Sequence, residues 1–243
     1  MIPFFRKIRK KMADDNKPMK YMRYAIGEIA LVVIGILIAL QINNWNEKRK
    51  SDIERAQLQK SLHDDLVLDT LLINQNIKSY KESLKYINSL YDRMYSGDAN
   101  LDTIKFIVQK EYKPGLKAIR NFNSATFNSM ESSGKLDLLQ SNLKSSIVKH
   151  YLTQKESIQM LDITVQSNVK MILDFNKVYS FQWSNDDSYM AKMAWGNIDE
   201  RDFVMRFNGV ISYHQHARLL NISTYIKLLN STRDLLTLLN NSN

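Results

Sequence analysis

The four histidines are the first residues to test for chemistry, because the chain contains no cysteine. Without cysteine there is no thiolate nucleophile, disulfide or Cys-based zinc site. His214 and His216 are two positions apart, and on a helix that spacing directs their rings about 160° away from each other. Di-iron helical bundles use Glu-x-x-His pairs, but the residues three positions before the histidines are Lys60, Ile147, Ile211 and Tyr213. We therefore expect no metal site, and one partly buried and one solvated histidine at 214 and 216.

Motifs for enzymatic activity are also absent from the sequence. The His-Asp-Asp triplet at 63–65 is acidic enough for acid–base chemistry, but such a triplet more often forms the solvated face of a helix. The Gly-Lys pair at 134–135 resembles part of a phosphate loop, yet Ser129 replaces the first glycine and Leu136 the magnesium-binding Ser or Thr. There is no G-x-S-x-G, H-E-x-x-H or dinucleotide motif. We expect neither catalysis nor a cofactor.

The strongest functional signal is a charged residue inside a long apolar segment, YAIGEIALVVIGILIALQI. On a helical wheel Glu28 shares one face with Val32, Gly35, Ala39 and Ile42. Gly35 and Ala39 form a small-xxx-small pair, which lets two helix backbones approach closely. A charged residue at membrane depth is a functional hypothesis by default, so this face predicts a transmembrane interface. The alternative is that Glu28 extends to the inner headgroups beside neighbouring basic residues.

This segment, residues 24–42, predicts one transmembrane helix. Its length of about 28 Å as a helix is close to the hydrocarbon thickness of ~30 Å. Tyr21 and Tyr24 precede it and Trp45 follows it, as expected for membrane-interface anchors. The alternative is a buried core helix of a soluble protein. A cleaved signal peptide is not expected, because the apolar stretch is too long and no small-x-small site follows Leu40; the helix is a signal anchor.

The net charge of +9 favours a lipid bilayer over nucleic acid as the partner. Residues 1–23 hold eight basic and two acidic side chains, whereas 26 basic and 22 acidic side chains are mixed after residue 42. No basic stripe of the kind that binds nucleic acid is visible there. Five basic residues occupy the opposite flank, 43–60, so the basic bias places the N-terminus in the cytoplasm. Residues 2–12 predict a basic amphipathic helix on the inner leaflet, with a frayed tail as the alternative.

Two stretches of the chain resemble a large family of uncharacterised Bacteroidota single-pass membrane proteins, a domain of unknown function. The first stretch is FFRKIRKK followed by YAIGEIALVVIGILIALQINNWNEKRK. The second, TFNSMESSGKLDLLQSNLKSSIVKHY at 126–151, is looser, and Met130 stands where the pattern prefers leucine. The resemblance implies an inner-membrane protein of a diderm bacterium with its bulk in the periplasm. It implies no activity, because none is established for the family.

The rest of the chain predicts long helices. Seven glycines and three prolines in 243 residues disfavour sandwiches and barrels. Apolar residues recur at spacings of three and four over 51–94, 142–179 and 198–239, as in coiled-coil or bundle helices; Thr70 breaks the first series. The fold class we expect is all-α, with one N-terminal transmembrane helix followed by an elongated antiparallel helical bundle.

Shorter elements connect these helices. A short helix is expected at about 101–110, ended by Pro114-Gly115, and Gly134 is a candidate left-handed cap. Residues 181–197 are expected to form a loop with three large aromatic residues, Trp183, Tyr189 and Trp195. Amphipathic aromatics in a loop predict a contact surface. The alternative is that the two tryptophans cap the bundle core.

These observations predict a basic cytoplasmic tail at 1–23, the transmembrane helix at 24–42 and a periplasmic helical-bundle domain at 43–243. We expect a non-enzymatic protein of the bacterial inner membrane that acts through protein–protein contacts, as a homo-oligomer or in an envelope complex. The alternative is a periplasmic ligand-binding sensor bundle, although no second transmembrane helix returns and 23 inner residues leave little room for signal output. A hydrolase with an irregular site is a third, weaker hypothesis.

Overall fold

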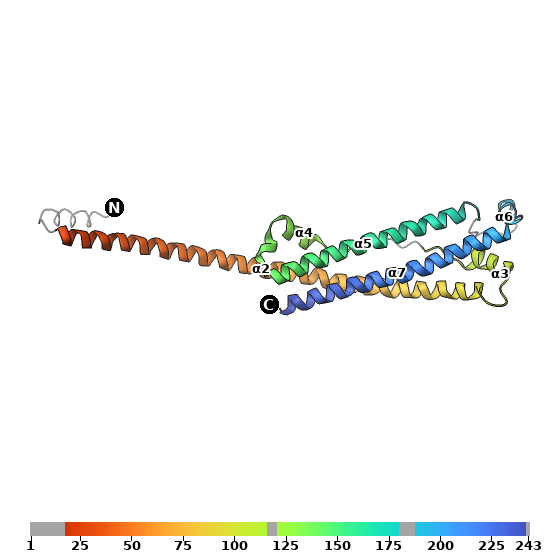
Figure 1. The fold of residues 1–243 in the computed structure, drawn as a ribbon, viewed down its shortest axis with the longest axis horizontal. Coiled ribbons are helices and arrows are strands. Elements are labelled where there is room, and N and C mark those ends of the chain that lie inside the picture. The colour runs from red at the N-terminus through yellow and green to blue at the C-terminus, as the bar shows by residue number, and fades with distance from the viewer. Residues whose placement is uncertain (1–17, 116–120, 180–187, 242–243) are drawn as a thin grey trace. The chain divides into compact units, whose positions relative to one another are not determined.

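A computed structural model describes residues 18–115, 121–179 and 188–241 (Figure 1). Within these ranges the regular elements are helices and no strand occurs, so the all-α prediction is confirmed. The chain divides into two compact units, Met1–Ala56 and Gln57–Asn243. The first helix, α2, contributes residues to both units.

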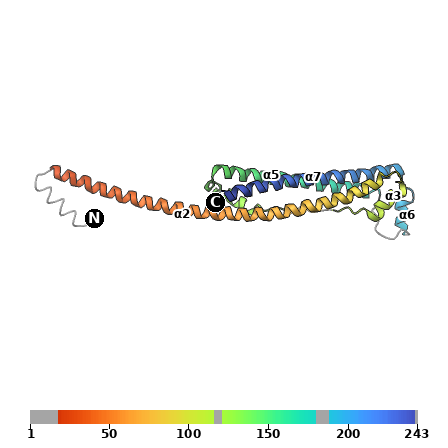
Figure 2. The same ribbon diagram turned by 90° about the horizontal axis from the view of Figure 1, so that it is seen from below.

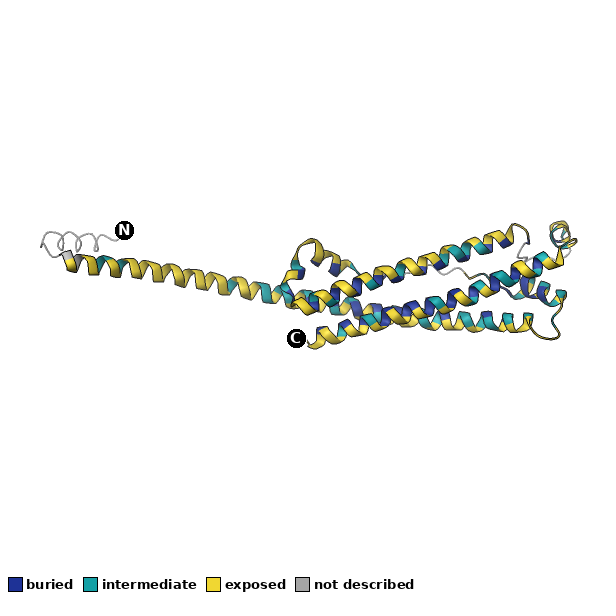
Figure 3. Cartoon of the chain, in the orientation of Figure 1, coloured by how far each residue is buried: buried dark blue, intermediate teal, exposed yellow. Residues whose placement is uncertain are grey.

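Helix α2 runs without interruption from Pro18 to Met94. The sequence had predicted two helices, at 24–42 and 51–94, and the structure joins them. The connecting residues NNWNEKRK contain no glycine or proline that would end a helix. What changes along α2 is the burial pattern: the described side chains from Met19 to Ala56 are exposed or half-exposed, whereas a buried stripe begins in the second unit (Figure 3).

The second unit contains the remaining elements of the described chain. They are α3 (Leu101–Phe106), the π-helical turn η1 (Ile107–Glu111), α4 (Ala125–Ser132), the 3-10 turn η2 (Lys135–Leu138), α5 (Ser141–Asn176), α6 (Tyr189–Trp195) and α7 (Glu200–Asn241). The helix expected at 101–110 is thus α3 with η1, and those expected at 142–179 and 198–239 are α5 and α7. Gly134 has a φ of 71°, as predicted for a left-handed cap.

The bundle has α7 antiparallel to both α2 and α5. At one end Leu62 packs with Leu143 and Leu239, and at the other end Ile87 packs with Ile172 and Phe207. Residue numbers therefore rise in the same direction along α2 and α5 and fall along α7, as Figures 1 and 2 show.

A parallel arrangement of α2 and α5 requires the chain to return along the bundle between them. Tyr112 lies in the core cluster at the α3 end, Phe122 in the central cluster and Phe127 in the cluster at the other end. The described residues 112–115 and 121–124, called the return segment below, are therefore held in the core at Tyr112 and Phe122. These three rings are buried, and burying a large apolar side chain contributes roughly 1.5–3 kcal/mol.

The predicted apolar stripes form this core. The stripe of α2, from Leu66 to Met94, faces α5 and α7 through buried or half-buried side chains. One detail of the prediction was wrong: the polar residue that interrupts the apolar series is Asp69 and not Thr70. Asp69 occupies the inward position between Leu66 and Ile73, and it is buried. Thr70 instead donates its hydroxyl to the Leu66 carbonyl at 2.9 Å.

Candidate functional site

The apolar segment of α2 is exposed within the first unit. The most hydropathic stretch has a mean hydropathy of 2.5, and none of it is buried by the rest of the chain. Leu31, for example, is 73% exposed. Apolar area in water costs about 25 cal/mol per Å², so this segment needs a lipid or protein environment. Its length and composition are compatible with a membrane anchor.

The predicted interface residues lie in the continuous α-helical part of this segment. Helical geometry puts Glu28, Val32, Gly35, Ala39 and Ile42 on one face, and all are exposed except Glu28, which is half-exposed. A Cβ built on Gly35 meets no atom within 4 Å outside its own helix backbone. The face is therefore open to a second helix, and a larger side chain at Gly35 has no intramolecular contact to disturb.

The predicted membrane-interface residues flank this segment on the same helix. Trp45 is exposed, and the Arg49 guanidinium lies 5.8 Å from its ring centroid, a cation–π geometry. Tyr24 is half-buried. The backbone of Tyr21 is in α2, but its side chain lies outside the described part of the structure.

The aromatic segment expected as a loop at 181–197 contains helix α6 instead over Tyr189–Trp195. Ser188 caps it by accepting the Ala191 N–H at 3.1 Å, and Ala, Met and Lys favour helix within it. Tyr189 is 75% exposed. Trp195 packs edge-to-face on Phe203, with ring centroids 5.5 Å apart. It therefore covers the end of the core, which is the alternative role considered for this tryptophan. Trp183 lies outside the described residues.

A buried carboxylate ties the return segment to the bundle. Asp69 Oδ1 accepts the Asn123 backbone N–H at 2.9 Å and the Asn123 amide at 2.8 Å, and its Oδ2 accepts Gln154 Nε2 at 3.1 Å. Burial raises the pKa of Asp69, while the hydrogen bonds from Asn123 oppose that shift. With its oxygens occupied by fixed donors, Asp69 holds α2, the return segment and α5 together.

The histidines occupy structural positions. His214 is fully buried with Nδ1 3.1 Å from the Tyr112 hydroxyl, and His216 is exposed, as their spacing predicted. Burial and the nearby Arg218 lower the pKa of His214 to about 3. His150 Nδ1 lies 2.9 Å from the Ser231 hydroxyl, and burial lowers its pKa to about 4. Both rings are neutral at pH 7. In the described ranges no three His, Asp or Glu side chains converge to hold a metal ion.

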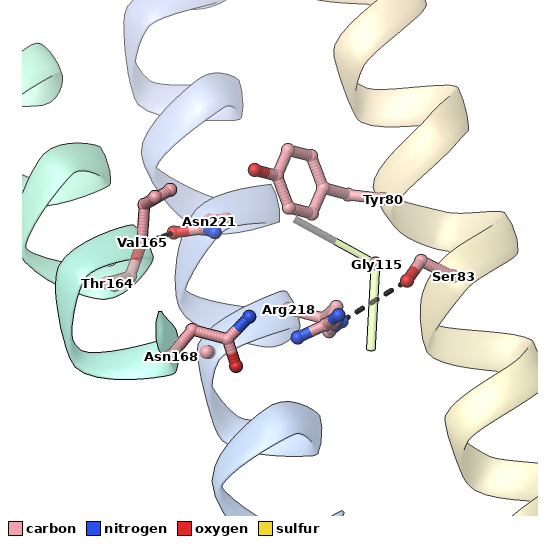
Figure 4. Close-up of a pocket in the computed structure, with 9 residues that line it drawn as sticks. Tyr80, Ser83, Gly115, Thr164, Val165, Asn168, Arg218 and Asn221 are labelled. Atoms are coloured by element: carbon pink, nitrogen blue, oxygen red, sulfur yellow. Dashed lines mark hydrogen bonds between the residues drawn. The ribbon is translucent and has the colours of Figure 1, made fainter. Parts of the chain in front are cut away.

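A small polar cavity lies between α2, α5 and α7 around Arg218 (Figure 4). Its volume is about 20 Å³. Arg218 is 7% exposed, and its Nε donates to the Ser83 hydroxyl at 3.2 Å. On α5, Thr164 donates its hydroxyl to Asn221 Oδ1 at 2.8 Å. Asn168 is also buried, and its Oδ1 has no hydrogen-bond partner within the described chain. Burial lowers the pKa of Arg218, and nearby tyrosines oppose the shift.

The sequence analysis missed this cavity, although a signal was present. Arg218 follows Ile211 by seven residues and precedes Ile222 by four, so it stands in the apolar register of α7. Asn168 stands likewise between Leu161 and Ile172 in α5. A polar residue at a position where the helical pattern predicts an apolar one indicates a polar place in the core. The prediction of the buried faces counted only apolar residues, so it did not include Arg218 and Asn168.

Comparison with known proteins identifies a family and no characterised relative. The model of a family of unknown function, DUF6090, matches residues 28–155, which is more than half of the chain. Neither the curated proteins nor the solved structures contain a match. The matched region runs from Glu28 through the exposed apolar segment, the return segment and the first half of α5. The chain therefore belongs to DUF6090, a family of unknown function.

Proposed function

We propose that this protein is a single-pass membrane protein of the cell envelope whose helical bundle acts without catalysis, through protein–protein contacts. The observation that carries the proposal is the uncovered apolar segment at 24–42. No described part of the chain packs over its most hydropathic stretch, and its 19 residues match a bilayer in length. The charged flank at 1–23 and the basic bias support a cytoplasmic N-terminus with the bundle in the periplasm.

The non-enzymatic part of the proposal is supported by the roles of the ionisable groups in the bundle. Asp69 has its oxygens occupied by fixed donors. His150 and His214 are neutral, buried and bonded to hydroxyl groups.

The second candidate function, a ligand-binding sensor bundle, takes the cavity at Arg218 as a binding site. The small volume of that cavity supports a bound water molecule or ion there rather than an organic ligand. A cavity needs roughly 10–15 Å³ to hold one water molecule, and this one has about 20 Å³. A metabolite does not fit, and protein contact remains the leading proposal.

Membrane topology tests the first half of the proposal. A reporter that needs the periplasm, fused after Asn243, is expected to be active, and the chain is expected to stay with membranes after an alkaline carbonate wash. Activity of a cytoplasm-only reporter at the same fusion point would overturn the orientation. Release of the chain by carbonate would overturn the membrane span.

Self-association of the transmembrane face tests the second half, with another copy of the chain as the first partner to try. Gly35→Leu is expected to weaken association, because it separates helices that approach at Gly35 and Ala39, on the order of 1–2 kcal/mol. Ile36→Leu, about 100° round the helix, is the matched control and is expected to change nothing. Glu28→Gln is expected to keep association and Glu28→Leu to reduce it. Equal association of the wild type, Gly35→Leu and Glu28→Leu would mean that the segment is an anchor only.

A further inference from the structure

The guanidinium of Arg218 is buried without a counter-charge from the described chain. No carboxylate of residues 18–115, 121–179 or 188–241 lies within ion-pair distance of it. The charged and titratable groups that act on it are Tyr80 from α2, Tyr112 from the return segment and Tyr213 on α7. The neighbouring His214 is neutral. Buried charges in proteins are almost always paired. We therefore expect an anion from outside the described chain to neutralise Arg218.

Several of the side chains that line the cavity beside Arg218 can donate hydrogen bonds. Ser83 accepts from Arg218 Nε and keeps its own hydroxyl proton to donate. Figure 4 shows Ser83 and Tyr80 approaching from α2, and Asn168 reaching from α5 toward Arg218. Asn168 carries an amide whose oxygen is buried and unbonded within the described chain. A half-turn of χ2 exchanges the positions of that oxygen and the NH₂ group, so either end of the amide can face the cavity.

The walls leave little capacity for a bound cation. Thr164 Oγ1 lies 2.8 Å from Asn221 Oδ1 and 2.7 Å from the Leu161 carbonyl, and these two acceptors share its one hydroxyl proton. The positive charge of Arg218 repels any cation that enters. The charge of Arg218 therefore selects a negative ion.

We propose that the cavity bounded by Arg218, Asn168, Ser83 and Tyr80 binds one small monatomic anion, of the size and charge of chloride. The volume of about 20 Å³ holds a single sphere somewhat larger than water. Sulfate, phosphate and organic carboxylates exceed it. The ion completes the electrostatics of the core where α2, α5 and α7 meet. This inference does not depend on the proposed protein contacts.

Thermal unfolding of the full-length chain in a non-ionic detergent tests the proposal. Potassium gluconate is replaced by potassium chloride or bromide at constant ionic strength. A ligand bound only by the folded state raises Tm, here by about 3–6 °C once its concentration exceeds Kd about tenfold. Potassium sulfate stabilises folded proteins by its exclusion from their surface, so any rise in Tm that it causes is expected to be the same with and without Arg218.

Two variants separate a specific site from a general salt effect. Arg218→Gln removes the cation, so Tm is expected to become independent of chloride. Arg233→Gln removes an exposed arginine of the same helix and is the matched control, which is expected to respond as the wild type does. A chloride response of equal size in Arg218→Gln would overturn the site.

Asn168→Asp keeps the test decisive even if Arg218→Gln fails to fold. The substitution is nearly isosteric and supplies a carboxylate beside the guanidinium. In gluconate the wild-type site holds no chloride, so the new carboxylate is expected to give this variant a higher Tm than the wild type. The Tm of the variant is also expected not to change with chloride. A wild type whose Tm is the same in gluconate and chloride would refute the proposal, as would an Asn168→Asp variant that is less stable than the wild type in gluconate.

Discussion

Acidification is expected to destabilise the bundle through its buried histidines, and His150→Gln isolates one of them. His150 lies on α5 with 2% of its surface exposed, and its Nε2 is buried without a hydrogen-bond partner among the described residues. A protonated ring there would have a charge in the core and one N–H without an acceptor. The folded protein therefore binds the proton on this ring less tightly than the unfolded chain does.

The size of the effect follows from the pKa of His150, which burial lowers from 6.5 to about 4. Because the folded pKa lies below the unfolded one, the stability is fully present above pH 6.5 and is lost as the pH falls toward 4. Each pKa unit corresponds to about 1.4 kcal/mol. Between about pH 7.5 and about pH 5 the wild type is thus expected to lose about 2 kcal/mol through His150 alone.

The measurement is the free energy of unfolding of the full-length chain in non-ionic detergent at these two pH values, followed by circular dichroism. His150→Gln is expected to lose about 2 kcal/mol less than the wild type between them. His216→Gln, which changes an exposed histidine, is expected to lose as much as the wild type. The reasoning would be refuted if His150→Gln and the wild type lost equal stability on acidification.

Three further substitutions test the packing and the backbone of the bundle by the same unfolding measurement. Ile147→Ala, in a fully buried side chain, is expected to cost about 2–4 kcal/mol, whereas Leu152→Ala on the exposed side of α5 is expected to cost less than about 0.5 kcal/mol; similar values for the two would mean that α5 faces the other way. Asp69→Ala is expected to cost about 1–3 kcal/mol, because the amides of Asn123 and Gln154 lose their acceptor, and a neutral effect would show that water replaces the carboxylate. Gly134→Ala is expected to cost about 1 kcal/mol, because an alanine at φ 71° is strained although the space beside it is open; no loss would indicate that the cap relaxes.

The sequence by itself determined the helical content of this protein and the inward face of each long helix. Helical periodicity is a local property, since residues three and four apart share a face whatever the helix packs against. The buried residues Leu66, Ile73, Ile147 and Phe207 could therefore be named before any partner helix was known. The exposure of segment 24–42 was equally predictable, because an unbroken apolar run needs no tertiary contact to be recognised.

Local conformation was less predictable where two conformations are close in free energy. The linker after residue 42 continues the helix because nothing in it ends a helix. Residues 189–195 are helical although their aromatic content favoured a loop prediction. In both places the residues have ordinary helix propensity and form a helix. The prediction of a helix end there rested on composition, because neither place has a glycine or proline that would end a helix.

Only the tertiary structure decided which polar groups meet inside the bundle. Asp69 and Asn123 are 54 positions apart, and they pair because the chain returns along the core between α3 and α4. The cavity at Arg218 exists because the registers of α2, α5 and α7 bring Ser83 and Asn168 to the same level. Periodicity fixes the face of a helix but not its axial position against its neighbours, which depends on how side chains of all three helices pack at once. The direction of α5, parallel to α2, was undetermined by the sequence for the same reason.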